Sequence, residues 1–240
     1  MENGPPFRFF ITHPKVVLLE WDTEPDDALL NRLIEFRKAI KKEFVEVIQI
    51  TQGYCSLMLF HDKAINTIDR YQTRLNLLYS SLVSFSKKKS KLWRIPVCYL
   101  EAWAPDLNAL SKSLNMTTDT LIEKHVSVRY RVQFIGFLPG FLYLSGLPKI
   151  LECARKDQPV SHVAKGSVAI GGKQTGIYPV NSPGGWHLIG KTPYPLFKPQ
   201  EENPCFAQAG DSIQFEPITR KNYWELEERI KNRTFKIRPE

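Results

Sequence analysis

The sequence has few cysteines, and no two of them lie close enough to form a metal or redox motif. The four are Cys55, Cys98, Cys153 and Cys205 in a chain of 240 residues. The absence of any C-x-x-C pair argues against a zinc ribbon or a thioredoxin-like centre, so buried free thiols are expected. The histidines at 13, 61, 162 and 187 also lack a spacing typical of metal ligands. We therefore predict no metal site.

Long hydrophobic runs are absent as well. No apolar stretch reaches the roughly 20 residues that span a bilayer. The opening "MENGPPFRFF" has prolines where a signal peptide would have its apolar run. We expect a soluble cytoplasmic protein that does not bind a membrane.

The chain is basic, with a formal net charge of +8. Its densest run of charge, "SKKKSK" at 86–91, has no interleaved aromatic residues and is typical of a solvated linker. We therefore predict no nucleic-acid partner. An anionic substrate or partner surface stays open as the alternative.

One phosphate-binding pattern is present in letters only. The segment "GWHLIGKT" (185–192) fits the P-loop pattern G-x-x-x-x-G-K-[ST]. Its middle residues are bulky and predict a strand, and prolines at 193, 195 and 199 leave no helix after Thr192. We expect a strand followed by a proline-rich turn.

The first half of the chain alternates strand and helix patterns. Apolar or alternating runs predict strands at 16–21, 44–50, 56–60 and 92–99, and helical spacing predicts helices at 26–42 and 63–84. The order β-α-β-β-α-β is that of a ferredoxin-like fold. Two short helices are expected next, at 104–115 and 116–127, the second with Thr117 or Thr118 as N-cap.

The second half has a different texture. From about residue 136, short apolar runs at 168–170, 177–180, 186–189 and 212–215 lie between many glycines and prolines. Short strands joined by such turns predict a barrel or sandwich. A closing helix is expected at 222–232. We therefore expect an α+β protein of two domains, residues 1–127 and 128–240.

Three segments of the second half resemble the core of one known family. They are "GFLPGFLYLSGLP" (136–148), "GSVAIGGKQTGIYP" (166–179) and "SPGGWHLIGKTP" (182–193). In order and spacing they are similar to the KipI family, also called allophanate hydrolase subunit 1, carboxyltransferase subdomain C/D, or PxpB, one of the subunits of bacterial 5-oxoprolinase. A looser agreement in the first half extends the resemblance over roughly residues 12–218.

The resemblance implies a fold and an activity. The fold is a ferredoxin-like N-terminal domain followed by a cyclophilin-like β-barrel. The activity is that of a subunit, inactive alone, of an ATP-dependent 5-oxoprolinase that opens 5-oxoproline to glutamate. The implied partners are a KipG-like sister subunit (PxpC) and a LamB/YcsF-like component (PxpA). ATP is expected at the level of the complex, and no cofactor is assigned to this chain.

One segment departs from the family pattern. Where the family reads roughly P-R-x-x-x-P-R-x-x-V-P-x-G-S-V, this chain reads "ARKDQPVSHVAKGSV" (154–168). Arg155 and Pro159 are kept, but Val160 replaces the second arginine, which removes a bidentate donor for carboxylate or phosphate. We predict that Arg155 holds an anion, with a domain-interface ion pair as the alternative.

His125 is the one catalytic candidate. The family also carries a histidine on a helix before a strand, and such a residue could transfer a proton or donate a hydrogen bond to substrate. A structural histidine with satisfied hydrogen bonds is the alternative.

The remaining substrate-binding candidates come from the family segments. They are Gln174, Thr175, Tyr178, Ser182 and Trp186. The first two lie in the turn "GGKQTG", where a ligand contact and an ordinary tight hairpin are both open. The other three are predicted to line a pocket of the barrel, although core packing is the alternative for Trp186.

Two other functions stay open. KipI itself inhibits a sensor histidine kinase, so a protein-binding role against a kinase is the first alternative. The second is a part of a carboxyltransferase, as in urea carboxylase, although the chain has no biotinyl Met-Lys motif.

Overall fold

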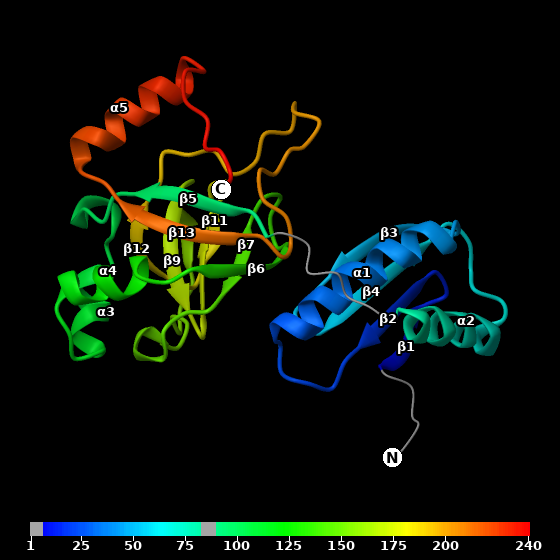
Figure 1. Cartoon of the computed structure of the whole chain (residues 1–240). Coiled ribbons are helices and arrows are strands. Elements are labelled where there is room, and N and C mark those ends of the chain that lie inside the picture. Colours follow the sequence, from blue (N-terminus) through cyan, green and yellow to red (C-terminus); the bar gives the residue numbers. More distant parts are fainter. Residues whose placement is uncertain (1–6, 83–89) are drawn as a thin grey trace. The chain divides into compact units, whose positions relative to one another are not determined.

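The computed structural model describes residues 7–82 and 90–240. The chain divides into two compact units, Met1–Lys89 and Ser90–Glu240, and each is described by itself (Figure 1). Most of the predicted linker at 86–91 lies outside the described residues.

The first unit is a four-stranded antiparallel sheet with two helices. The strands are β1 (Arg8–His13), β2 (Val16–Glu20), β3 (Val47–Gln52) and β4 (Ser56–His61), in the spatial order β1-β2-β4-β3. The helices are α1 (Asp27–Glu43) and α2 (Ile68–Ser81). Asp26 caps α1 by accepting a hydrogen bond from the Leu29 N–H at 2.6 Å.

The core of this unit follows from side-chain periodicity. Helix α1 buries Leu29, Leu33, Phe36 and Ile40, which recur at helical spacing. Strands β2 and β4 bury alternate residues, such as Leu19 and Leu57, and these join the residues of α1 and α2 in one cluster. The two helices therefore pack on the same face of the sheet.

The predicted strand order of this unit is partly wrong. A ferredoxin-like sheet would take the segment at 92–99 as its last strand. Instead Leu92–Val97 forms β5 in the second unit, and the edge position beside β2 is taken by β1. Local sequence gives a strand's periodicity but not its sheet, and β5 is buried at nearly every residue because it joins the larger sheet.

The second unit is built on a barrel-like sheet. Its seven strands have the order β12-β9-β10-β7-β6-β13-β5, all antiparallel except for the parallel pair β13–β5. Besides β5, the strands are β6 (Tyr130–Ile135), β7 (Leu142–Ser145), β9 (Ser167–Gly171), β10 (Gln174–Ile177), β12 (His187–Lys191) and β13 (Ser212–Pro217). β8 (Val160–Val163) and β11 (Ser182–Gly184) form a separate ribbon.

Backbone hydrogen bonds nearly close this sheet on itself. Just after β5, Cys98 exchanges two hydrogen bonds with Lys191 at the end of β12, at 2.8 and 2.9 Å. The two edge strands of the sheet are thereby joined at one end. The predicted barrel is confirmed as a barrel-like sheet in a mixed α+β chain.

The helices of the second unit are α3 (Leu107–Ser113), α4 (Thr118–Val126) and α5 (Arg220–Lys231), with short 3₁₀ turns η1 (Glu101–Trp103) and η2 (Lys149–Leu151). Thr117 is the N-cap of α4, as expected, and its Oγ1 accepts from the Thr120 N–H at 3.1 Å. The closing helix predicted at 222–232 is α5.

The boundary between the units lies earlier than the predicted 127/128. Leu107 and Leu110 of α3 and Leu121 of α4 belong to the same core as Val132 and Ile170 of the barrel-like sheet. Because these helices and β5 bury their apolar faces there, the division falls between Lys89 and Ser90. The change of texture near residue 136 marks the glycine-rich part of one unit, not its start.

Two other expectations concern motifs and membranes. The segment 187–191 is a strand, and no helix follows Thr192 directly in the described structure, so the P-loop pattern is a coincidence of letters. None of the helices within residues 7–82 and 90–240 is long and apolar enough to cross a bilayer.

Candidate functional site

The segments that carry the family resemblance converge on one cavity of the second unit. The cavity has a volume of about 200 Å³. Its lining residues are Phe137, Phe141, Tyr143, Arg155, Lys156, Pro159, Tyr178, Gly184, Gly185 and Trp186. Three of the predicted substrate-binding residues, Arg155, Tyr178 and Trp186, are therefore brought together there.

Aromatic rings form the wall of this cavity. The Trp186 indole lies edge-to-face with Phe141 at 5.5 Å between ring centroids and with Tyr143 at 6.1 Å. Phe141 also meets Tyr178 edge-to-face at 5.4 Å. Trp186 and Tyr178 are buried in a small cluster that includes Phe141. Rings that lock one another at these angles give a rigid, mostly apolar surface.

Glycines make room for two of these rings. A Cβ at Gly171 would lie 2.5 Å from Cδ1 of Trp186, and one at Gly184 would lie 2.3 Å from the Tyr178 hydroxyl oxygen. Both distances are far shorter than a normal contact. The glycines of "GGKQTG" and "SPGGW" are thus needed to seat the indole and the phenol at the cavity.

Arg155 supplies the positive charge of the site. Its guanidinium carbon lies 5.7 Å from the Trp186 ring centroid, close enough for a cation–π interaction. The side chain is exposed, and within the described ranges no carboxylate forms an ion pair with it. It is therefore free to bind an anion at the mouth of the cavity.

Lys156, the next residue, is held in place instead. Its ammonium pairs with Asp106 Oδ2 at 2.7 Å, and both side chains are about four-fifths buried, with exposures of 19% and 20%. The same carboxylate oxygen accepts from the Leu188 N–H at 2.7 Å, and the Lys156 N–H donates to the Gly185 carbonyl at 2.8 Å. These contacts fix the Arg155–Lys156 segment against β12.

The two tyrosines of the cavity are neutral hydrogen-bonding groups. Burial raises the pKa of Tyr143 and of Tyr178, and the positive charge of Arg155 opposes part of each rise. The cavity therefore offers phenol groups rather than phenolates at neutral pH.

His125 lies elsewhere, in the core of the second unit. Its side chain is fully buried and its ring stacks on Phe215 at 4.6 Å. Nδ1 bonds to the Tyr99 hydroxyl at 2.8 Å, and Nε2 bonds to Thr175 Oγ1 at 2.9 Å. Burial lowers the pKa of His125 to about 3. The imidazole is therefore neutral at physiological pH.

The tautomer of His125 follows from its partners. The Thr175 hydroxyl donates its one proton to the Ala169 carbonyl at 2.9 Å. Thr175 Oγ1 must then accept from His125, so the ring carries its proton on Nε2 and Nδ1 accepts from Tyr99. Both ring nitrogens are engaged by protein groups, which favours the structural reading of His125 over proton transfer. Thr175 shares this buried position.

Gln174 and Ser182 lie outside the cavity lining. Gln174 is opposite Gly171 in the β9–β10 hairpin, on the face that carries the Trp186 indole, and its Oε1 is buried with no hydrogen-bond partner among the described residues. Ser182 pairs with Val163 in the β8–β11 ribbon, and its hydroxyl bonds to the Pro183 carbonyl at 3.1 Å.

Sequence reasoning missed several residues of the site. Phe141 and Tyr143 lie in the first family segment, and their spacing of two residues at the start of β7 could have placed both on one face. Lys156 is adjacent to the predicted Arg155. Asp106 gives no detectable signal, because it lies far away in the chain and reaches Lys156 only through the fold.

No group of three or more His, Cys, Asp or Glu side chains within residues 7–82 and 90–240 is arranged to hold a metal ion. The site is thus defined by an aromatic pocket with a guanidinium at its edge, on an α+β unit with a barrel-like sheet.

Comparison with known proteins places this fold and these motifs in one family. The family model "carboxyltransferase domain, subdomain C and D" matches residues 8–207, and the chain belongs to that family.

The curated relatives include proteins of two bacteria that are each named as the B-type subunit of 5-oxoprolinase. The Bacillus subtilis protein is 43% identical over 133 residues, a match that covers 55% of this chain and 55% of the relative. The Haemophilus influenzae protein is 37% identical over 184 residues, or 77% of this chain and 85% of the relative. The match thus spans little more than half of the Bacillus protein. The resemblance to the KipI and PxpB family is confirmed.

The fold recurs in a solved enzyme structure. Urea carboxylase from Kluyveromyces lactis matches with a TM-score of 0.79 at 19% identity, covering 98% of this chain and 24% of that chain. A conserved uncharacterized protein of Pyrococcus horikoshii matches with a TM-score of 0.55 at 32% identity, covering 90% of this chain and all of its own.

Proposed function

We propose that this chain is a subunit of an ATP-dependent 5-oxoprolinase that opens 5-oxoproline to glutamate. Relatives whose names make them subunits of 5-oxoprolinase support this reading. Since an enzyme with named subunits is an assembly, the chain acts with partner subunits, for which we propose a KipG-like sister subunit (PxpC) and a LamB/YcsF-like component (PxpA). We propose that it is inactive alone.

The observation that carries the proposal is the cavity where the family segments meet. 5-Oxoproline is a five-membered lactam ring with one carboxylate. The Trp186 and Phe141 rings offer an apolar surface for such a ring, and Arg155 offers a cation at the edge for the carboxylate. The neutral phenol of Tyr143 or Tyr178 is suited to hydrogen-bond the lactam.

Val160 bears on how the substrate is held. With one arginine where the family has two, Arg155 alone supplies the guanidinium of this segment. Lys156 is occupied by Asp106 and does not replace the missing group. We therefore propose that the carboxylate is bound by a single arginine, while Trp186 fixes the orientation of the ring.

ATP does not fit this cavity. Pockets for drug-sized ligands measure roughly 300–1,000 Å³, and the cavity, at about 200 Å³, is smaller. The P-loop letters at 185–192 form a strand. ATP would supply a phosphoryl group that activates the lactam carbonyl, and we assign no step of that transfer to this cavity. Its residues bind and orient the lactam and exclude water from it.

A second candidate function rests on the family description itself. The urea amidolyase of Saccharomyces cerevisiae is 21% identical over 255 residues, which cover 93% of this chain and 14% of the relative. A role as part of a carboxyltransferase acting on a urea-type amide is therefore the next candidate.

The proposal is tested in lysates of the source organism with and without the gene. We expect ATP-dependent conversion of 5-oxoproline to glutamate to be lost on deletion and restored when the purified chain is added back. Urea as alternative substrate tests the second candidate. Unchanged 5-oxoproline conversion in the deletion lysate would contradict the proposal, and a protein-binding role, such as kinase inhibition, would then be examined.

A further inference from the structure

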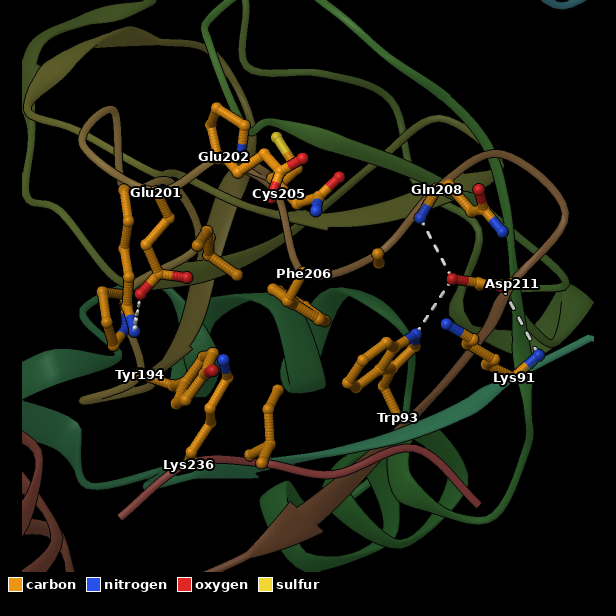
Figure 2. A pocket seen from close by; sticks show the side chains of 17 residues that line it. Lys91, Trp93, Tyr194, Glu201, Glu202, Cys205, Phe206, Gln208, Asp211 and Lys236 are labelled. Atoms are coloured by element: carbon orange, nitrogen blue, oxygen red, sulfur yellow. Dashed lines mark hydrogen bonds and ion pairs between the residues drawn. The ribbon is translucent and has the colours of Figure 1, made fainter. Parts of the chain in front are cut away.

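A second, larger cavity in the same unit contains none of the residues predicted for substrate binding. Its volume is about 480 Å³, and strand β5, the 194–208 segment, Asp211 and the residues Lys236 and Ile237 line it (Figure 2). This volume falls in the range of roughly 300–1,000 Å³ typical of small-molecule pockets.

A row of aromatic rings lines this second cavity. Phe206 lies edge-to-face with Trp93 at 5.1 Å between centroids and with Tyr194 at 5.6 Å. Trp93 and Tyr194 are buried, whereas Phe206 is partly exposed. Figure 2 shows the Phe206 ring between the other two at the centre of the cavity. The row offers a planar ligand an aromatic surface on which to pack.

Hydrogen bonds hold this row in position without a ligand. Asp211 is buried, and its Oδ2 accepts from Trp93 Nε1 at 3.0 Å and from the Gln208 N–H at 3.0 Å (Figure 2). The indole orientation and the 208–211 turn are thus fixed together. A preformed surface of this kind loses little conformational entropy when a ligand binds.

Positive charge lies at both ends of the row. The Lys91 ammonium is 5.9 Å from the Trp93 ring centroid, and that of Lys198 is 5.9 Å from the Tyr194 ring centroid. Lys198 is already paired with Glu201 at 3.1 Å. In the part of the chain that the structure describes, neither Lys91 nor Lys236 forms an ion pair. The charge that is free for a ligand beside the aromatic row is therefore mainly positive.

We propose that this cavity binds a small planar aromatic anion. The ring packs on Phe206 and Trp93, and the anionic group lies against Lys91, while Lys236 adds to the positive field at the other end. An aromatic carboxylate and a nucleoside monophosphate share this chemistry. The site is separate in its lining residues from the cavity at Arg155 and Trp186.

The test uses the full chain and two probes, indole-3-carboxylate and adenosine monophosphate. Calorimetric titration measures affinity, and the indole N–H signals in a ¹H–¹⁵N spectrum report the place of binding. The Trp93 signal is identified by its loss in Trp93→Phe. We expect saturable binding of at least one probe, with the Trp93 signal shifted. The tighter probe distinguishes a carboxylate ligand from a nucleotide.

Variants decide whether the lysine contributes. Lys91→Gln removes an exposed charge without touching the core, and we expect about a tenfold weaker affinity, as for loss of a charged hydrogen bond. The matched control, Lys112→Gln on α3, is expected to bind as the unaltered chain does. The proposal is overturned if neither probe saturates, if the Trp93 signal does not move, or if both variants bind equally. No 5-oxoproline is used, so the outcome is independent of the proposed 5-oxoprolinase function.

Discussion

Single residues next to each other in the sequence have different surroundings in this fold. Arg155 is exposed beside the Trp186 ring, while Lys156 is tied to Asp106. Gln174 faces the indole, while Thr175 faces the core and bonds to His125. Neighbouring residues of a strand point to opposite faces, so a motif read as one unit contributes to two different environments.

This alternation explains which site residues could be predicted. Arg155, Tyr178 and Trp186 are predictable because the family segments and simple chemistry point to a cation and aromatic walls. The role of His125 could not be settled from sequence, because its partners Tyr99 and Thr175 come from distant parts of the chain.

The buried His125 predicts a pH-dependent stability. Its pKa is about 3 in the folded chain, and that of an unfolded histidine is about 6.5. The unfolded state therefore binds the proton first, and the free energy of unfolding falls as the pH drops below about 6.5, levelling off only near the folded pKa. Between pH 7.5 and pH 5 we expect a loss of about 2 kcal/mol from this group, measured by urea denaturation.

Two variants isolate the contribution of His125. Gln at 125 carries both a donor and an acceptor but does not titrate, so His125→Gln is expected to flatten the pH dependence over this interval. His162→Gln, at an exposed position, is expected to keep it. An unaltered slope in His125→Gln would show that other groups cause the acid sensitivity.

At the scale of elements, the helices and most strands follow from periodicity, while sheet membership does not. The α1 pattern and the Thr117 cap are readable because both are local. β1 takes the place expected for β5, because pairing with β2 or with β13 is decided by contacts between segments far apart in the chain.

The β11 end and its glycines yield a prediction at this scale. In Gly184→Ala the new Cβ would lie 2.3 Å from the Tyr178 hydroxyl, so the phenol must move. We expect the free energy of unfolding to fall by about 1–3 kcal/mol, the usual cost of overpacking. Urea denaturation of the purified chain measures it.

The neighbouring glycine is the matched control. A Cβ at Gly185 would meet its nearest atom, Pro159 Cγ, at 3.6 Å, which is an ordinary contact. Gly185→Ala is expected to change stability by no more than about 0.5 kcal/mol. Equal destabilisation by the two substitutions would contradict the steric account of the aromatic seat.

The whole molecule consists of two units with separate cores. Sequence texture indicates two domains but misplaces their boundary, because composition changes near residue 136 while packing joins α3, α4 and β5 to the barrel-like sheet. Composition reports local turn chemistry, whereas a domain boundary depends on which apolar faces are buried together.

Fragments test this boundary. Residues 90–240 are expected to unfold cooperatively on their own, because they contain the complete second core. Residues 128–240 lack β5 and the Leu107, Leu110 and Leu121 side chains, and we expect them to aggregate or to show no cooperative transition. Circular dichroism during thermal unfolding compares the two. A cooperative transition in 128–240 would support the later boundary instead.

The central claim is that the cavity beside Arg155 and Trp186 binds the lactam substrate. The most direct measurement is 5-oxoproline conversion after add-back of Arg155→Gln to the deletion lysate, with Arg220→Gln, an exposed arginine of α5, as control. We predict at least about tenfold lower activity at limiting 5-oxoproline for Arg155→Gln, from the loss of a charged hydrogen bond, and full activity for Arg220→Gln. Full activity of Arg155→Gln would contradict the account.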